Sequence, residues 1–174
     1  MDKAEDIALK EGEKYGINEA MVIYTSKIDV RDYVLLKCRF GCTRYGLSYN
    51  CPPNTPTPDE TRKILAEYKK AVLVGGDVQG FEEQKKIAEG ILAIERALFL
   101  KDYYKAFGLT PGACTICNIC SVHEDKPCKH PEKCRPSMES MGIDVFSTLK
   151  RFKKNLDVIK DRTKFICYGL ILLE

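Results

Sequence analysis

Nine cysteines, most of them gathered in two short stretches, constrain this 174-residue chain more than any other feature of its sequence. Five cysteines and both histidines lie within GACTICNICSVHEDKPCKHPEKCRPSMES (112–140), and three more cysteines lie within KCRFGCTRYGLSYNCPPN (37–54). The longer stretch has few apolar residues and cannot hold a shape through a core of its own. So dense a set of soft ligands predicts loops that fold around a metal cofactor.

The cysteine count and the N-terminus indicate where such a chain works. An odd number of cysteines fits a purely disulfide framework poorly. The N-terminus, MDKAEDIALKEGEKYG, alternates charges and lacks the apolar run of a signal peptide. No apolar run approaches the ~18 residues that span a bilayer. We therefore expect a cytoplasmic protein, not bound to a membrane, whose reduced thiols serve metal or redox chemistry.

The charge balance gives no case for a nucleic-acid partner. The net charge of +3 comes from 28 basic and 25 acidic residues spread along the chain. One basic run, LKRFKKNLDVIKDRTK (149–164), is typical of a solvated helix face. It could also receive an acidic partner such as a redox protein.

Alternating helical and strand signals predict one domain over residues 1–174, with a cysteine-rich lobe at about 109–142. We expect helices at 2–15, 57–70, 81–107 and 137–141, and another that begins at Asp144. Apolar runs predict strands at 20–24, 29–38, 71–78 and within 164–174. Strand order cannot be read from the sequence. The expected fold is α/β or α+β, a single sheet of about four strands packed by helices, with two cysteine-rich metal-binding loops.

The spacing Cys114-x2-Cys117-x2-Cys120 carries the most specific chemistry. Three cysteines at this spacing can occupy three corners of a cubane, as in bacterial-type ferredoxins. Zinc sites instead draw two ligands from one such knuckle and two from a remote one. The pattern favours one or two [4Fe-4S] clusters, with zinc or unligated thiols as the alternatives.

The fourth ligand of that group is open. Cys128 is the nearest candidate and Cys134 the reserve, while Cys51 is eligible because it precedes proline. His123 and His130 have the chemistry to bind a metal. Surface polar residues, or hydrogen-bond partners of cluster sulfurs, are the more common roles for histidines in such loops.

The N-terminal group, Cys38, Cys42 and Cys51, stops at three cysteines in a loop rich in turn-forming glycine and proline. Nearby cations would favour thiolates and a negatively charged cluster: Lys37, Arg39 and Arg44. A fourth ligand could come from Cys134 or Cys167, or one metal corner is left for water, substrate or a partner. Structural thiols in an irregular loop are the alternative. Cys167, alone in an apolar strand, is most simply a core residue.

Three motifs make this chain resemble the small predicted metal-binding proteins of domain-of-unknown-function family 2284: CRFGCTRYGLSYNCPPNTPTPDETR, CTICNIC and PCKHPEKCRPSMESMGIDV. The likeness runs from Val30 to Val145. It implies metal binding by seven motif cysteines: Cys38, Cys42, Cys51, Cys114, Cys117, Cys120 and Cys128. A small non-cysteine residue is usual where Cys134 stands. The family carries no established reaction, so the resemblance assigns no catalytic residue.

Other catalytic constellations are missing, so any activity would run through the metal centres. The sequence predicts electron transfer or a cluster-based reductive reaction, as in an iron–sulfur oxidoreductase. The alternative is a zinc-binding structural or interaction module without catalysis. We expect the C-terminal group to hold an electron-relay cluster and the N-terminal group an open, substrate-binding one. Polar residues of the N-terminal loop could orient an anionic or sulfur-containing ligand, although loop surface is the more common role for each: Arg39, Arg44, Tyr45, Tyr49 and Asn50.

Overall fold

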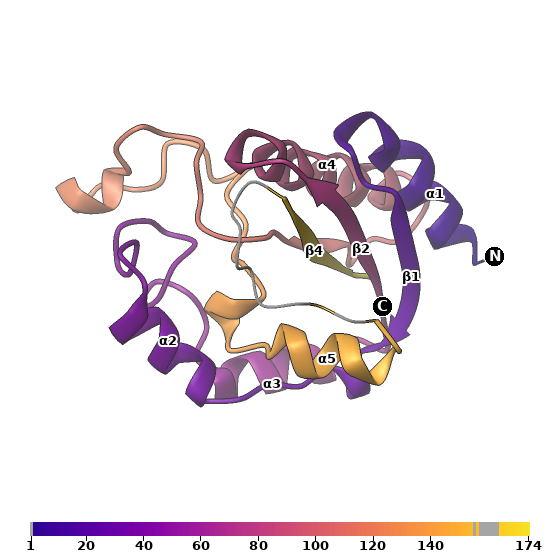
Figure 1. The fold of residues 1–174 in the computed structure, drawn as a ribbon, viewed down its shortest axis with the longest axis horizontal. Coiled ribbons are helices and arrows are strands. Elements are labelled where there is room, and N and C mark those ends of the chain that lie inside the picture. The colour runs from indigo at the N-terminus through magenta and orange to yellow at the C-terminus, as the bar shows by residue number, and fades with distance from the viewer. Residues whose placement is uncertain (1, 155, 157–163) are drawn as a thin grey trace.

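The protein folds around a four-stranded antiparallel sheet in the order β1-β2-β4-β3 (Figure 1). The computed structural model describes residues 2–154, 156 and 164–174. Its strands are β1 (Glu19–Tyr24), β2 (Lys70–Val78), β3 (Phe107–Leu109) and β4 (Phe165–Leu172). Since every neighbouring pair is antiparallel, the fold is α+β, one of the two classes that the sequence predicted.

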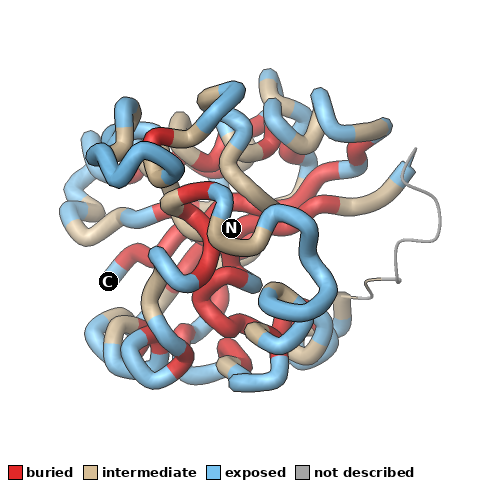
Figure 2. Tube along the Cα trace, turned by 90° about the vertical axis from the view of Figure 1, so that its left-hand side faces the viewer, coloured by how far each residue is buried: buried red, intermediate tan, exposed pale blue. Residues whose placement is uncertain are grey.

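Helices cover both faces of this sheet. The helices α1 (Lys3–Gly12) and α4 (Phe81–Phe99) pack on one face. On the other side lie α2 (Tyr33–Gly41), α3 (Pro58–Ala66) and α5 (Val145–Arg151). Buried apolar residues therefore form two clusters, one on each face, and Figure 2 shows the buried trace gathered between exposed outer segments.

The central strand β2 confirms the strand predicted at 71–78. Val72 and Val74 belong to the cluster under α1 and α4, whereas Ala71 and Leu73 belong to the cluster under α3 and α5. Successive side chains of a strand point to opposite faces, and both faces here are covered. This double burial explains the continuous apolar run. The strands predicted at 20–24 and within 164–174 are also confirmed.

Two predicted helix starts are confirmed by their caps. In α3 the Glu60 backbone N–H donates to Thr57 Oγ1 at 3.3 Å, and the Thr57 N–H donates to Glu60 Oε2 at 2.8 Å. This is the capping box expected from the sequence, although α3 ends at Ala66 and not at residue 70. Asp144 caps α5 by accepting the Ser147 N–H at 3.0 Å.

The strand predicted at 29–38 is wrong. Within it Val30 forms a single β-bridge, and α2 begins at Tyr33. Val34 is buried and lies one helical turn before Cys38, whereas Leu36 is 58% exposed, so the apolar residues that suggested a strand lie on different sides of a helix. Leucine and lysine favour the helix, and Gly41 is its last residue. The fourth strand of the sheet is β3 instead.

The long helix predicted at 81–107 ends at Phe99. Asp102 has a φ of +74°, which a right-handed helix excludes. Tyr103 nevertheless packs against the core cluster beside α4, so the apolar periodicity continues past the end of the helix. Gly108 is a strand residue and not a helix stop. A Cβ atom there would lie 2.8 Å from Ile91 Cγ2, so only glycine lets β3 approach α4.

Two further predictions concern the C-terminal third. The short helix expected at 137–141 is a single 3-10 turn, η4 (Glu139–Met141). Half of the basic run 149–164 lies outside the described residues, which include neither 155 nor 157–163. Its role as a solvated helix face is therefore untested. Within the described part of the chain, none of the helices has the length and apolar character needed to cross a bilayer.

Candidate metal centre

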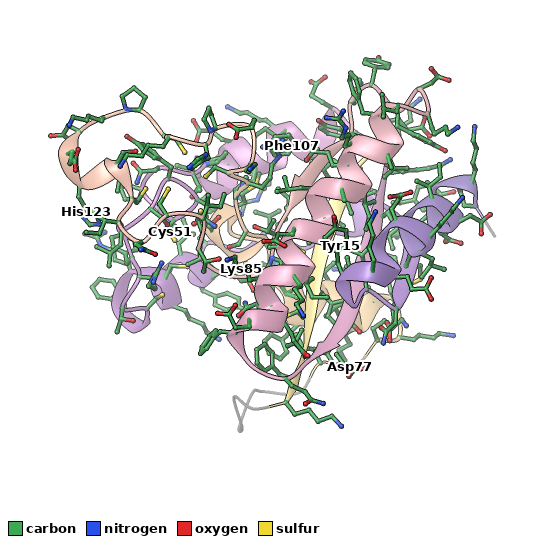
Figure 3. All side chains as sticks on the ribbon, turned by 90° about the horizontal axis from the view of Figure 1, so that it is seen from above. Tyr15, Cys51, Asp77, Lys85, Phe107 and His123 are labelled. Atoms are coloured by element: carbon green, nitrogen blue, oxygen red, sulfur yellow. The ribbon has the colours of Figure 1, made fainter. Side chains whose placement is uncertain are left out.

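Two cysteine-bearing loops lie at the same end of the molecule. The first loop, residues 38–54, continues from the end of α2, and the second loop, residues 112–136, follows β3. Figures 1 and 3 both place these segments at the end away from α1, where Cys51 of the first loop and His123 of the second are labelled. Cysteines far apart in the sequence are thus gathered in one region.

The first loop presents its cysteines from a helix end and a series of tight turns. Cys38 lies in the last turn of α2, and Cys42 is the extended residue that ends the helix. The loop then doubles back, with the Gly46 N–H donating to the Pro52 carbonyl at 3.0 Å. Gly46 has a φ of +73°, a conformation that favours glycine. Cys51 at the far side of this turn is buried.

The Asn50 side chain joins the two loops. Its Oδ1 accepts the Cys114 backbone N–H at 2.8 Å, and its Nδ2 donates to the Gly112 carbonyl at 3.1 Å. The same Oδ1 also accepts the Ser48 hydroxyl at 2.8 Å and the Cys51 thiol at 3.4 Å. Asn50 is 1% exposed, so a role as loop surface is excluded. It sets the position of one cysteine from each group.

Arg44 and Tyr49 add contacts across the same junction. Arg44 Nη2 donates to the Cys114 carbonyl at 3.1 Å, and the Tyr49 hydroxyl donates to the Lys126 carbonyl at 2.6 Å. The backbone N–H of Arg44 also donates to Cys42 Sγ at 3.4 Å. These contacts hold the first loop against the second along its length.

The second loop encloses a cavity of about 130 Å³. Arg44, Ser48 and Tyr49 of the first loop form part of its wall, and both His123 and His130 also line it. Five thiols face this one space: Cys114, Cys117, Cys120, Cys128 and Cys134. The 3-10 turn η3 (Ser121–Glu124) reverses the chain, and the Ser121 hydroxyl donates to the Pro127 carbonyl at 2.7 Å.

An ion pair fastens the end of the second loop to α4. Arg135 donates through Nε to Glu95 Oε2 at 2.9 Å and through Nη2 to Oε1 at 2.7 Å. Both side chains are 14% exposed. Glu95 Oε2 also accepts the Gly108 N–H at 2.7 Å, so a single carboxylate joins α4, β3 and the end of the loop.

The thiols of the first loop influence one another. Burial, followed by the proximity of Cys42, Glu139 and Cys51, raises the pKa of Cys38 to about 11. Burial also raises the pKa of Cys51, and Cys42 and Cys114 add to that rise. The three predicted cysteines of this group therefore lie close together, with Cys114 of the second loop nearby. The raised pKa values of Cys38 and Cys51 favour their thiol forms, and a bound metal would favour the thiolates.

In the second loop the Cys114 and Cys134 thiols contact each other. A hydrogen bond with Cys134 is the largest of the effects that lower the pKa of Cys114, and Arg44 and His130 contribute further. The same contact, together with burial, raises the pKa of Cys134. Cys128 adds to that rise, so it lies close to Cys134. The lowered pKa favours the thiolate form of Cys114.

The remaining sulfur, Cys167, is outside both groups. It is a buried residue of β4 in the core cluster under α1 and α4, as the sequence suggested. Burial raises its pKa to about 12, and the nearest titrating neighbour that contributes is Glu139. It does not line the cavity of the second loop.

Cys134, the reserve ligand suggested by the sequence, lines the same cavity as the other four thiols of the second loop, although the motif resemblance did not include it. Other features of this region were not foreseen from the sequence. Glu95 and Arg135 carry no local signal, because the partners come from a helix and a loop that are 40 residues apart. Asn50 was noted only as one of several polar loop residues.

The donors present suit a thiolate-bound cofactor. A cavity faced by five thiols offers the ligands that iron–sulfur clusters and zinc use in proteins. Over the described residues, no three His, Cys, Asp or Glu side chains already converge to hold a single metal ion. The fit therefore rests on the chemistry of the donors and on their grouping.

The fold and its grouped thiols place this chain in the class of small cysteine-rich α+β metal-binding proteins. More particularly, it belongs to the family described as predicted metal-binding protein (DUF2284), which matches residues 21–173. No curated protein shows significant similarity to the chain. No solved structure matches it either.

Proposed function

We propose that this protein is an iron–sulfur protein that binds one or two [4Fe-4S] clusters for electron transfer or a reductive reaction. The observation that carries the proposal is the cavity of the second loop, which five thiols line. Three of them have the Cys-x2-Cys-x2-Cys spacing that suits a cubane better than a zinc ion. Membership of a predicted metal-binding family supports metal binding, without specifying the metal.

The second loop would hold its cluster through Cys114, Cys117, Cys120 and Cys128, with Cys134 as a further thiol in the same cavity. When bound, an iron–sulfur cluster supplies one-electron transfer. The surrounding residues enclose and orient the ligands. Asn50 fixes the backbone of Cys114, and the Ser121–Pro127 hydrogen bond fixes the turn between Cys120 and Cys128.

The first loop would hold a cluster that is open to substrate. Its local set is Cys38, Cys42 and Cys51, while Cys134 lies in the second loop and Cys167 in the core. An open coordination position lets a substrate bind a metal as to a Lewis acid. This arrangement supports an iron–sulfur oxidoreductase, with the second loop as the electron relay.

A zinc-binding structural or interaction module is the second candidate. The observation that favours it is that His123 and His130 line the same cavity as the cysteines. Mixed cysteine and histidine sets are the usual ligands of structural zinc. Such a module would hold the two loops together and would carry no electrons.

A redox protein is the proposed partner, and the cytosol is the proposed compartment because thiols stay reduced there. Large apolar side chains stand exposed around the cysteine loops, among them Phe40 at 78% and Ile119 at 69% exposure. We propose that these exposed side chains contact the partner. Docking at this end would bring a partner close to the cofactor.

The proposal is tested by the visible spectrum of protein purified without oxygen. Iron–sulfur protein is brown and absorbs broadly at roughly 400 nm, whereas zinc protein is colourless. Cyanide should perturb the spectrum of the open cluster only, and Cys38→Ser should abolish that response while the other absorbance survives. A colourless preparation that holds stoichiometric zinc and cannot be reconstituted with iron would instead establish the zinc module.

A further inference from the structure

The mouth of the thiol-lined cavity has an apolar rim. Leu47 of the first loop and Ile116 and Ile119 of the second loop line that cavity. These residues are nevertheless 41%, 39% and 69% exposed, respectively, so they stand where the cavity opens to solvent. Exposed aliphatic side chains scattered singly over a surface need no explanation, but three that border one opening are typical of a surface that binds a partner.

Two cations stand at the same mouth. Arg44 and Lys129 line the cavity, and both are exposed. Neither forms a salt bridge with a described acidic residue, although Arg44 Nη2 donates to the Cys114 carbonyl at 3.1 Å. Among the described residues that line the cavity there is no aspartate or glutamate. The rim therefore combines apolar contacts with positive charge.

The loops around this mouth are basic as a whole. The first loop contains two basic and no acidic residues, and the second contains four basic and three acidic residues. Of these acids, Glu124 forms a salt bridge with Lys126 at 2.8 Å, while Asp125 and Glu132 are exposed. A cluster with four thiolate ligands is itself anionic, but it would lie inside the cavity, whereas the two cations stand at its opening. A partner that approaches the mouth therefore meets the cations first.

We propose that an acidic one-electron carrier protein docks on this mouth. Its carboxylates would contact Arg44 and Lys129, and an apolar centre would contact Leu47, Ile116 and Ile119. The inference rests on the proposed function, in which the second loop is the electron relay, because a carrier seated on the mouth lies directly over the relay cluster. Complementary charge steers such an encounter, and apolar contacts at its centre hold the complex.

A nucleic acid suits this surface less well than an acidic protein. The exposed apolar side chains of the rim are aliphatic, and they offer no ring on which a base can stack. The charge of the whole chain is also nearly balanced. Single-stranded RNA is therefore included in the test as the competing partner.

The first test measures binding by titration calorimetry to the intact, anaerobically purified protein. The ligands are an acidic ferredoxin, an acidic flavodoxin, the basic carrier cytochrome c and a short single-stranded RNA. We expect saturable 1:1 binding of at least one acidic carrier at low salt, and binding at least about tenfold weaker in about 0.5 M salt, because salt screens exposed charges. Equal binding of cytochrome c, tighter binding of the RNA, or no saturable binding of either acidic carrier would overturn the proposal.

Binding is read here without electron transfer, so the docking proposal and the iron–sulfur proposal fail separately. Metal and sulfide analysis of the same sample identifies the cofactor. A zinc protein that binds an acidic carrier would refute the cofactor alone. An iron–sulfur protein that binds neither acidic carrier would refute the docking surface alone.

The second test locates the surface with matched pairs of variants. Lys129→Glu should weaken binding of the acidic carrier about fivefold or more, and Ile119→Ser should do so by a similar factor. The controls are Lys101→Glu and Leu100→Ser, at exposed positions beyond the last residue of α4, and they should change the affinity by less than about twofold. Equal losses in the control variants would contradict the assignment.

Carbodiimide cross-linking locates the same surface without any variant that must fold and keep its metal. This reagent condenses an amine with a carboxylate that touches it. In the unmodified complex it should join Lys129 to a carboxylate of the carrier in preference to Lys101, as mapped by mass spectrometry. Cross-links at Lys101 and none at Lys129 would place the carrier elsewhere and overturn the proposal.

Discussion

At the scale of single residues, the junction of the two cysteine loops depends on the buried amide of Asn50. It satisfies the Cys114 N–H and the Gly112 carbonyl, two backbone groups that water reaches poorly at this depth. Leaving a buried polar group without its partner costs roughly 1–3 kcal/mol. The amide therefore contributes both to stability and to the placement of Cys114 beside the first loop.

We predict that Asn50→Ala lowers the free energy of unfolding by about 2 kcal/mol and weakens metal retention in both loops. Asn54→Ala is the matched control, because Asn54 lies in the same loop but is exposed, and its side chain makes one hydrogen bond among the described residues, to the Ser48 carbonyl at 3.3 Å. Urea unfolding monitored by circular dichroism measures the first effect and metal analysis the second. Equal losses in the two variants would show that Asn50 has no special role in joining the two loops.

The cysteines allow a second prediction at the same scale. Cys117→Ser or Cys120→Ser should lower the iron content of the purified protein by about half if two clusters are present, because serine is a poor substitute for a thiolate ligand. We expect Cys167→Ser to leave iron nearly unchanged, since Cys167 lies in the core cluster beside α4. Iron per chain is the measurement. A similar loss at all three positions would show that the ligand assignment is wrong.

At the scale of secondary-structure elements, the sequence predicted the features that depend on residues adjacent in the chain. The strands β1, β2 and β4 follow from apolar runs, and the starts of α3 and α5 follow from capping residues. The strand predicted at 29–38 is the helix α2 instead. Its few apolar residues fit both the two-residue period of a strand and the 3.6-residue period of a helix, and only tertiary packing decides between the two. The predicted end of α4 was wrong for a related reason. Tyr103 lies beyond the helix but packs against the same core cluster, so its apolar character suggested a longer helix.

The candidate metal centre could likewise be predicted only in part. Sequence spacing placed the cysteines in two groups, and the structure gathers them accordingly in two adjoining loops. The contacts that join the loops could not be predicted, because they link residues with no sequence relation. Asn50 meets a backbone group 64 residues away, and Arg135 meets a helix 40 residues before it. Such pairs depend on the tertiary fold.

The ion pair between Asp29 and Arg151 allows an element-scale prediction about pH. Arg151 lies at the end of α5 and donates to Asp29 Oδ2 at 2.5 Å and to Oδ1 at 2.8 Å. This hydrogen bond is the main cause that lowers the pKa of Asp29 below its usual 3.8. A carboxyl whose pKa is lower in the folded state stabilises the fold above its unfolded pKa. That stability is lost as the pH falls through the folded pKa.

Asp29→Asn should therefore lower the free energy of unfolding at pH 7 by about 1 kcal/mol, a modest value because Arg151 is half exposed. The difference from the unmodified protein should shrink below about pH 4. Urea unfolding at pH 7 and at about pH 3 measures it, and comparing the two proteins cancels any loss of metal in acid. Asp32→Asn, at an exposed pair, is the control. A difference that stays constant with pH would contradict the assignment.

At the scale of the whole molecule, the two buried clusters on the sheet and the cysteine loops are stabilised in different ways. The clusters bury aliphatic side chains on both faces of β2 and β4. The second loop contributes no residue between 112 and 136 to either cluster. Its shape therefore depends on hydrogen bonds, on the Arg135–Glu95 pair and on whatever its thiols bind.

We predict that removal of the metal loosens the second loop and leaves the sheet folded. Hydrogen exchange measured by mass spectrometry should increase at 112–136 on metal removal, because the free energy of ligand binding is part of the folding free energy of this segment. Exchange in β2 and β4 should stay slow, which provides the internal control. Loss of protection throughout the sheet would mean that the metal supports the whole fold.

The central claim is that the grouped thiols hold iron–sulfur clusters, and its most direct test is the amount of iron, inorganic sulfide and zinc per chain in protein purified without oxygen. The account predicts iron and sulfide in equal amounts, with little zinc. About eight of each would mean a cluster in both loops, and about four would mean one cluster. Stoichiometric zinc with no inorganic sulfide, persisting after attempted reconstitution with iron, would contradict it.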